Sequence, residues 1–96
     1  MGSVILRNAP DVSDARSHVS VDGYVREWIL WMADSGQDSV RIFIDPDEIA
    51  RLTGHETLFP RQESLEKVRD KVALAVNRLY SARPGVKFEL GLNSLN

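Results

Sequence analysis

The amino-acid sequence predicts an α+β fold in which a small antiparallel sheet packs against a short and a long helix. Two apolar runs, at about 28–33 and 39–44, flank a polar segment that contains glycine, as in a β-hairpin. Residues 62–82 repeat apolar side chains at helical spacing, and residues 86–90 alternate as a strand does. A chain of 96 residues encloses one hydrophobic core, so we expect a single domain over residues 1–96.

The N-terminal segment, residues 1–17, is expected to be a loosely held arm. Residues 3–6 have the composition of a short strand, but a cluster of turn-forming residues around Pro10 follows them. The remainder of the segment is polar and offers little apolar surface to a core.

Residues 21–27 fit either a helix or a strand. Apolar side chains at helical spacing cross this segment, whereas residues 28–33 alone also fit a short strand. A five-residue loop with a glycine, residues 34–38, then leads into the clean alternation of residues 39–44. Such a loop between two apolar runs is typical of a hairpin, so we favour a strand from about residue 28 onward.

The predicted hairpin is apolar on both faces, because every position from 28 to 32 and from 42 to 44 is apolar. One face can pack on the helices, and the other must be covered as well. Either the N-terminal arm or a second copy of the chain can provide that cover. The second alternative predicts self-association. The candidate interface residues are Ile29, Trp31 and Phe43.

A dense helix-start signal follows the hairpin. Asp45 can cap a first turn, Pro46 suits the first helical position, and Glu48 stands where the acid of a capping box reaches back. Gly54 is a stop signal, so the pattern predicts a short helix over residues 46–53.

The strongest helical pattern runs from about residue 62 to residue 82 and ends before Pro84 and Gly85. We expect its apolar seam to cover the sheet and its charged face to lie in solvent. Residues 86–90 should form a last strand that joins the hairpin. The seam consists of Leu65, Val68, Val72, Ala75 or Val76, and Leu79.

The composition excludes several classes of protein. The absence of cysteine excludes disulfides and thiolate zinc sites, and it favours the cytoplasm because small secreted domains usually depend on disulfides. The longest apolar run, residues 28–33, is far shorter than the roughly 20 residues that cross a bilayer, so we expect no membrane association. A net charge of −2 gives no overall field that would attract a polyanion.

No group of residues has the pattern of a catalytic, cofactor or metal site. His18 and His55 have no His or carboxylate at a helical ligand spacing, so we interpret them as isolated surface histidines. The acids of residues 45–48 are explained by helix capping, and a calcium loop would need a glycine and a distal glutamate that are missing. We therefore expect no catalytic residues, no cofactor and no metal.

The C-terminal half is the more basic part of the chain. Acids interleave with the cations of residues 62–82, so a solvated helix face is the simplest interpretation. Contact with nucleic acid is the second interpretation. Its candidate residues are Arg61, Lys71, Arg78 and Arg83.

Several of these patterns occur together in a known family. Residues 29–34, a polar turn with glycine, residues 40–44, and then Ile49 and Leu52 follow one another along the chain. This order resembles the hairpin-into-helix pattern of the bacterial family of small proteins numbered 1488 among domains of unknown function.

The long predicted helix is similar to that family as well. Arg69, Val72 and Tyr80 match its pattern of an arginine, an aliphatic residue three later and a tyrosine eleven after the arginine. The resemblance covers residues from about 28 to 90. Family members often have a cysteine in the second strand, where this chain has Ile42 or Phe43, which argues against a thiol role. The resemblance implies an α+β fold with a small antiparallel sheet, and it implies no activity because none is assigned to the family.

The sequence alone does not specify a biochemical function. The leading hypothesis is a non-enzymatic cytoplasmic interaction or binding module, with a homodimer as one form of it, because the hairpin needs cover and no catalytic set is visible. The second hypothesis is a weak nucleic-acid-binding accessory protein. The third is a small-ligand binder or enzyme with a pocket near His55 and Tyr80.

Overall fold

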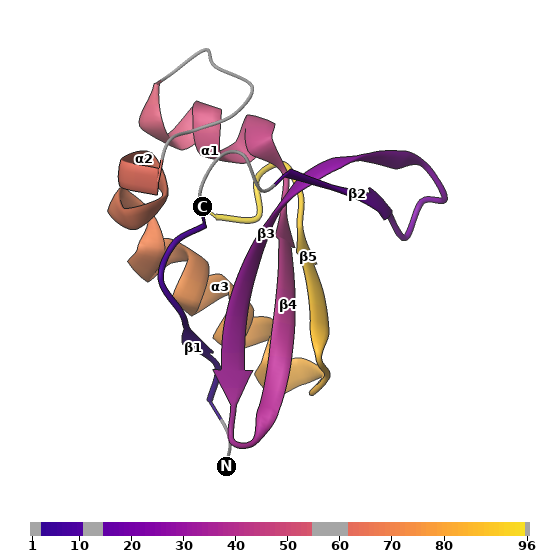
Figure 1. The fold of residues 1–96 in the computed structure, drawn as a ribbon, viewed down its shortest axis with the longest axis vertical. Helices are drawn as coiled ribbons and strands as arrows, with labels where there is room; N and C mark the ends of the chain where they lie inside the picture. Colours follow the sequence, from indigo (N-terminus) through magenta and orange to yellow (C-terminus); the bar gives the residue numbers. More distant parts are fainter. Residues whose placement is uncertain (1–2, 11–14, 55–61, 96) are drawn as a thin grey trace.

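A mixed β-sheet of five strands and three helices make up the described part of this computed structural model, residues 3–10, 15–54 and 62–95 (Figure 1). The predicted α+β fold class is confirmed. In chain order the elements are β1 (Ile5–Leu6), β2 (Ala15–Val19), β3 (Val25–Ser35), β4 (Asp38–Ile44), α1 (Pro46–Thr53), α2 (Gln62–Lys67), α3 (Arg69–Ala82) and β5 (Lys87–Leu90).

The predicted hairpin consists of β3 and β4, and it is longer than expected. Its strands pair from Ile29 opposite Ile44 to Ser35 opposite Asp38, so the turn has two residues and not five. Gly36 has a φ of 61°, the positive value that the first position of a type II′ turn requires. Residues 25–27, where helix and strand were both open, belong to β3.

Both N-terminal strands pair antiparallel with β3. β1 pairs at Ala33 and Asp34, and β2 pairs with the first residues of β3, from Val25 to Ile29. The segment expected to be a loose arm therefore contains two strands among its described residues. The alternation in this segment is too short to predict strand pairing by itself. The pairing depends on the edge of β3, which supplies the partner backbone groups.

β5 corrects the expectation of a fully antiparallel sheet, because it pairs parallel with β4. The sheet order is β1-β3-β4-β5, with β2 paired to β3. Three helices connect β4 to β5 and return the chain to the end of the sheet where β4 began. A parallel pair requires such a crossover, and the helical stretch between the two strands provides it.

The ends of α1 agree with the prediction from the sequence. The Asp45 carboxylate accepts the Asp47 amide at 2.9 Å, and Gly54 ends the helix with a φ of 73°. Glu48 does not complete a capping box, because the Asp45 amide already donates to the Leu90 carbonyl of β5. The Glu48 carboxylate lies instead in the core, where it accepts from Arg51 and from the Leu95 amide.

The single helix expected over residues 62–82 is two helices, α2 and α3, separated at Val68. The Val68 backbone has φ −104° and ψ 7°, and its amide bonds to the Leu65 carbonyl, three residues back. No Gly or Pro marks this break in the sequence. Val68 is buried, so its packing in the core accompanies the change of direction.

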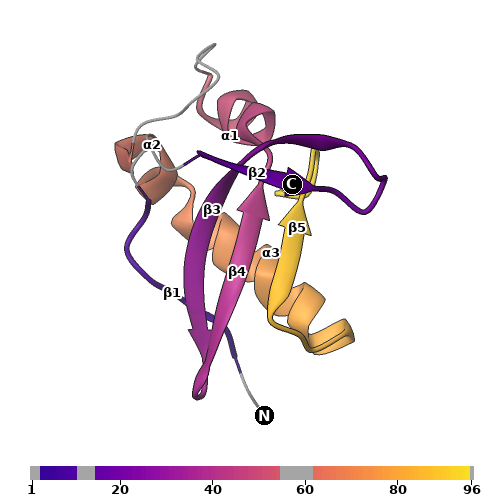
Figure 2. The same cartoon turned by 45° about the vertical axis from the view of Figure 1, so that its right-hand side comes forward.

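The core lies between the sheet and the helices, with α3 running behind β3 and β4 (Figure 2). The predicted apolar seam contributes to it, although Leu79 is partly exposed. We use the name outer face for the side of the sheet opposite the helices. The helix-facing side chains of the sheet are Ile29, Trp31, Ala33, Val40, Ile42, Ile44, Phe88 and Leu90.

Candidate interaction surface

The expected interface residues do not form one surface. Ile29 and Trp31 point into the core beneath the helices, where they are 6% and 0% exposed. The Trp31 indole donates to the Arg7 carbonyl at 2.9 Å, and the Arg69 guanidinium lies 5.3 Å from the centre of its ring. Phe43 lies on the outer face but is only 7% exposed. The chain itself covers all three side chains.

The β2–β3 hairpin covers Phe43. Figure 2 shows β2 crossing in front of the sheet near the ends of β3, β4 and β5. The His18 ring stacks on Phe43 with centroids 3.8 Å apart and packs edge-on against Trp28. The expectation of an isolated surface histidine is therefore wrong for His18. Two covers are predicted for the second face of the hairpin, the N-terminal arm and a second copy of the chain. At this end of the sheet the cover comes from the same chain, through β2.

Glu89 fixes this covering strand to β5. Its Oε1 lies 3.1 Å from Nε2 of His18 and accepts the Val21 amide at 3.1 Å. Residues about 70 positions apart in the sequence thus meet on the outer face. One carboxylate sets the position of the hairpin relative to the sheet.

Beyond this contact the hairpin projects from the body of the molecule (Figure 1). Residues 19–25, which we call the hairpin tip, turn through Gly23, whose φ is 88°. Val19 and Val25 are opposite each other, and they lie on the face that His18 does not occupy. Four apolar side chains of the tip are exposed: Val19 58%, Val21 95%, Tyr24 73% and Val25 66%.

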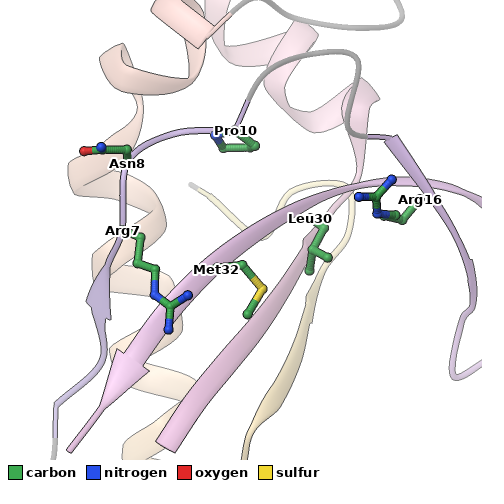
Figure 3. A pocket seen from close by; sticks show the side chains of 6 residues that line it. All are labelled: Arg7, Asn8, Pro10, Arg16, Leu30 and Met32. Carbon is green, nitrogen blue, oxygen red and sulfur yellow. The ribbon is translucent and has the colours of Figure 1, made fainter.

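A second feature of the outer face is a shallow trough made of two adjoining hollows that share Met32. The first, about 430 Å³, lies beside the interruption between β1 and β2 (Figure 3). The second, about 660 Å³, extends across β4 to β5. Leu30 and Met32 point from β3 into the first hollow in Figure 3. The trough residues are Arg7, Asn8, Pro10, Arg16, Leu30, Met32, Asp38, Ser39, Arg41, Val86 and Lys87.

Side chains of the helices hold residues 4–9, two of which, Arg7 and Asn8, line the trough. Asn77 accepts the Val4 amide at 2.8 Å and donates to the Val4 carbonyl at 3.0 Å, as a neighbouring strand would. Arg69 donates to the carbonyls of Leu6 and Arg7, and Glu66 accepts the Ala9 amide. The hydrogen bond from Arg69, then that from the Ala9 amide, lowers the pKa of Glu66.

Arginines form ion pairs with two carboxylates of the outer face, Asp34 and Asp45. Arg7 binds both oxygens of Asp34, at 2.8 and 2.6 Å, and this hydrogen-bonded contact lowers the pKa of the Asp34 carboxyl. Arg26 lies 3.4 Å from Asp45, and His18 contacts Glu89. Within the described residues, no ion pair neutralises three cations of the trough: Arg16, Arg41 and Lys87.

The candidate nucleic-acid residues lie on the other side of the molecule, and Arg61 lies outside the described residues. Lys71 and Arg78 are exposed on one face of α3, two turns apart. Together with Leu95 they line a small hollow of about 170 Å³. Arg83 is exposed at the end of the helix.

Of the two residues expected beside a pocket, His55 lies outside the described residues and Tyr80 is described. The Tyr80 hydroxyl accepts from Ser35 at 2.9 Å, and its ring packs beside Phe88. Over residues 3–10, 15–54 and 62–95, no three His, Asp or Glu side chains are placed to hold a metal ion. In the same ranges, no helix is both long and apolar enough to cross a membrane.

The sequence contains part of the signal for one of the two surface features, the hairpin tip. Val19, Val21, Tyr24 and Val25 surround an Asp-Gly pair, which is a hairpin-turn signal when apolar residues flank it. The trough has no local signal, because its residues come from the segment after β1 and from four strands, β2, β3, β4 and β5, with Val86 just before the last of them. A scan against family models and searches of curated proteins and solved structures found no match to this chain.

Proposed function

We propose that this protein is a non-enzymatic interaction module that associates with a second copy of itself through the hairpin tip. The observation that carries the proposal is the exposure of Val19, Val21, Tyr24 and Val25 on an arm that projects from the body. Apolar side chains gathered on a projecting element are typical of protein contacts, whereas single exposed apolar residues need no explanation.

A symmetric dimer suits the geometry of the tip. In a two-fold dimer the same patch of each copy contacts the other, so two hairpins can pack their valine faces together. Val19 and Val25 lie directly opposite each other and form such a face. Four side chains provide an area near the lower limit for a specific interface, about 1,000 Å² in total, so we expect weak, concentration-dependent association.

Sedimentation equilibrium over a range of micromolar concentrations tests the proposal. We expect a mass that rises from monomer toward dimer, and a strictly monomeric particle over this range contradicts self-association. Val21→Ser and Val25→Ser should each weaken association by about tenfold, because an apolar contact is lost and a polar group replaces it.

Leu74→Ser is the matched control. Leu74 is an exposed apolar residue of α3, far from the tip in the fold, and is 54% exposed. It should leave the association constant unchanged. Equal weakening by all three variants would indicate non-specific apolar association and would contradict a role for the tip.

A nucleic-acid-binding accessory function is the alternative. It is supported by Lys71 and Arg78, which line one hollow on α3, and by Arg83 at the helix end. Binding to mixed DNA and RNA at low salt that declines steeply as salt rises would favour this alternative. We place the protein in the cytoplasm because it has no cysteine, and in bacteria because of the family resemblance.

A further inference from the structure

We propose that the trough on the outer face binds an extended acidic segment of a partner protein, with acidic residues at both ends and an apolar residue between them. This site is separate from the hairpin tip. The two surfaces have no residue in common, so each can fail without the other.

The register of the strands places the trough residues in one row. Arg7 donates its amide to the Met32 carbonyl, Met32 is opposite Arg41, and Arg41 is opposite Lys87. Opposite residues point to the same face of a sheet, so this row crosses from the β1 edge to the β5 edge. The row has cations at both ends and the Met32 side chain between them.

The length of the ligand follows from the positions of Arg16 and Arg41. Arg16 is opposite Trp28, four residues along β3 from Met32, and it lies two strand steps from Arg41. Steps of about 4.8 Å between strands and about 3.3 Å along a strand place these two residues roughly 16 Å apart, so an extended peptide of about five residues crosses the sheet diagonally. Acidic side chains at its first and last residues would lie beside Arg16 at one end and Arg41 or Lys87 at the other.

Charge complementarity favours an acidic occupant. The chain has a net charge of −2, yet the carboxylates Asp34, Asp45 and Glu89 on this face are each in contact with a cation or His18. Arg16, Arg41 and Lys87 are exposed and have no such contact within the described residues. The face therefore has cations to offer, and only Asp38 among the trough residues opposes them without an ion pair in the described part.

The same geometry disfavours a nucleic acid as the occupant. Single strands bind by stacking bases on exposed aromatic rings between cations. The aromatic rings of the outer face, Trp28 and Phe43, are buried under His18 and Arg26. The side chains between the cations are the half-buried Leu30 and Met32, which suit an aliphatic side chain of a peptide.

Fluorescence anisotropy with a labelled five-residue peptide tests the proposal. The probe has acidic residues at its first and last positions, a leucine at its third and alanine elsewhere, with blocked termini. We expect saturable binding that weakens as salt rises, because exposed charges carry part of the affinity. Arg16→Glu and Arg41→Glu should each reduce the affinity by about tenfold or more, because each replaces an attraction by a repulsion.

Arg78→Glu on α3 is the matched charge-reversal control and should leave the affinity unchanged, and circular dichroism of each variant confirms its fold. A peptide with lysine at both ends should not bind, and one with serine at its centre should bind more weakly. The proposal is overturned by the absence of saturable binding at millimolar peptide, by an affinity in Arg16→Glu and Arg41→Glu that equals that of the unaltered protein, or by a short oligothymidylate that binds more tightly than the peptide. Val21→Ser should retain peptide binding, which separates this result from that for the hairpin tip.

Discussion

Glu48 is a fully buried carboxyl group, and its burial taken alone disfavours the charged form. It is 0% exposed, and its carboxylate accepts from Arg51 at 2.7 and 3.1 Å and from the Leu95 amide at 2.8 Å. Burial alone raises the pKa of Glu48, but the hydrogen bonds from Arg51 and Leu95 outweigh it and hold the pKa below its ordinary value. A single carboxylate therefore connects α1 to the residues after β5.

Glu48→Gln should destabilise the protein at neutral pH by about 1–3 kcal/mol, because the amide can still accept from Leu95 but no longer pairs as a charge with Arg51. A carboxyl with a lowered folded-state pKa stabilises above its ordinary pKa, and this contribution is lost as the pH falls through the folded-state value. Urea unfolding of both proteins from pH 7 to about pH 3 should show the difference shrinking toward low pH. Asp47→Asn, the same change at an exposed neighbour, is the control, and a pH-independent difference would contradict the charge-based explanation.

At the scale of elements, a side chain of α3 makes the hydrogen bonds that a neighbouring strand would make at the edge of the sheet. Asn77 makes two hydrogen bonds to the Val4 backbone, although Val4 precedes the paired residues of β1. Asn77→Ala should cost about 1–3 kcal/mol and increase hydrogen exchange at the Val4 amide, because both backbone groups lose their partner. Exchange measured by mass spectrometry and thermal unfolding check this result. Arg78→Ala, at the next position of α3, should change neither quantity, and unchanged exchange in Asn77→Ala would contradict the role of Asn77.

The sequence predicts elements whose signals are local and misses relations that depend on distant residues. Asp45 and Gly54 bound α1 as expected, because caps act within a few residues. The break at Val68 has no local breaker, so it depends on packing. Alternation showed that both hairpin faces are apolar, but it cannot show which face the helices cover. For this reason Ile29 and Trp31 were candidates for a surface and are part of the core.

At the scale of the whole molecule, the two proposed surfaces lie on the side of the sheet that the helices leave open. His18 and Glu89 hold the hairpin over one end of this side, and the trough occupies the remainder. The trough residues come from segments that span nearly the whole chain, from Arg7 to Lys87, so they converge only after folding. The sequence therefore shows the cations and the apolar residues, but the register of the strands decides that they lie on one face.

The parallel pairing of β5 with β4 has a consequence during synthesis. The ribosome makes the chain from its N-terminus, so β4 and all three helices emerge before residues 87–90. Until then the β4 edge has unpaired backbone groups, and such edges can recruit strands of other nascent chains. Four residues of β5 close that edge. Slow translation after residue 82 would prolong this exposed state, and a chaperone that shields strand edges would limit pairing with other chains during it.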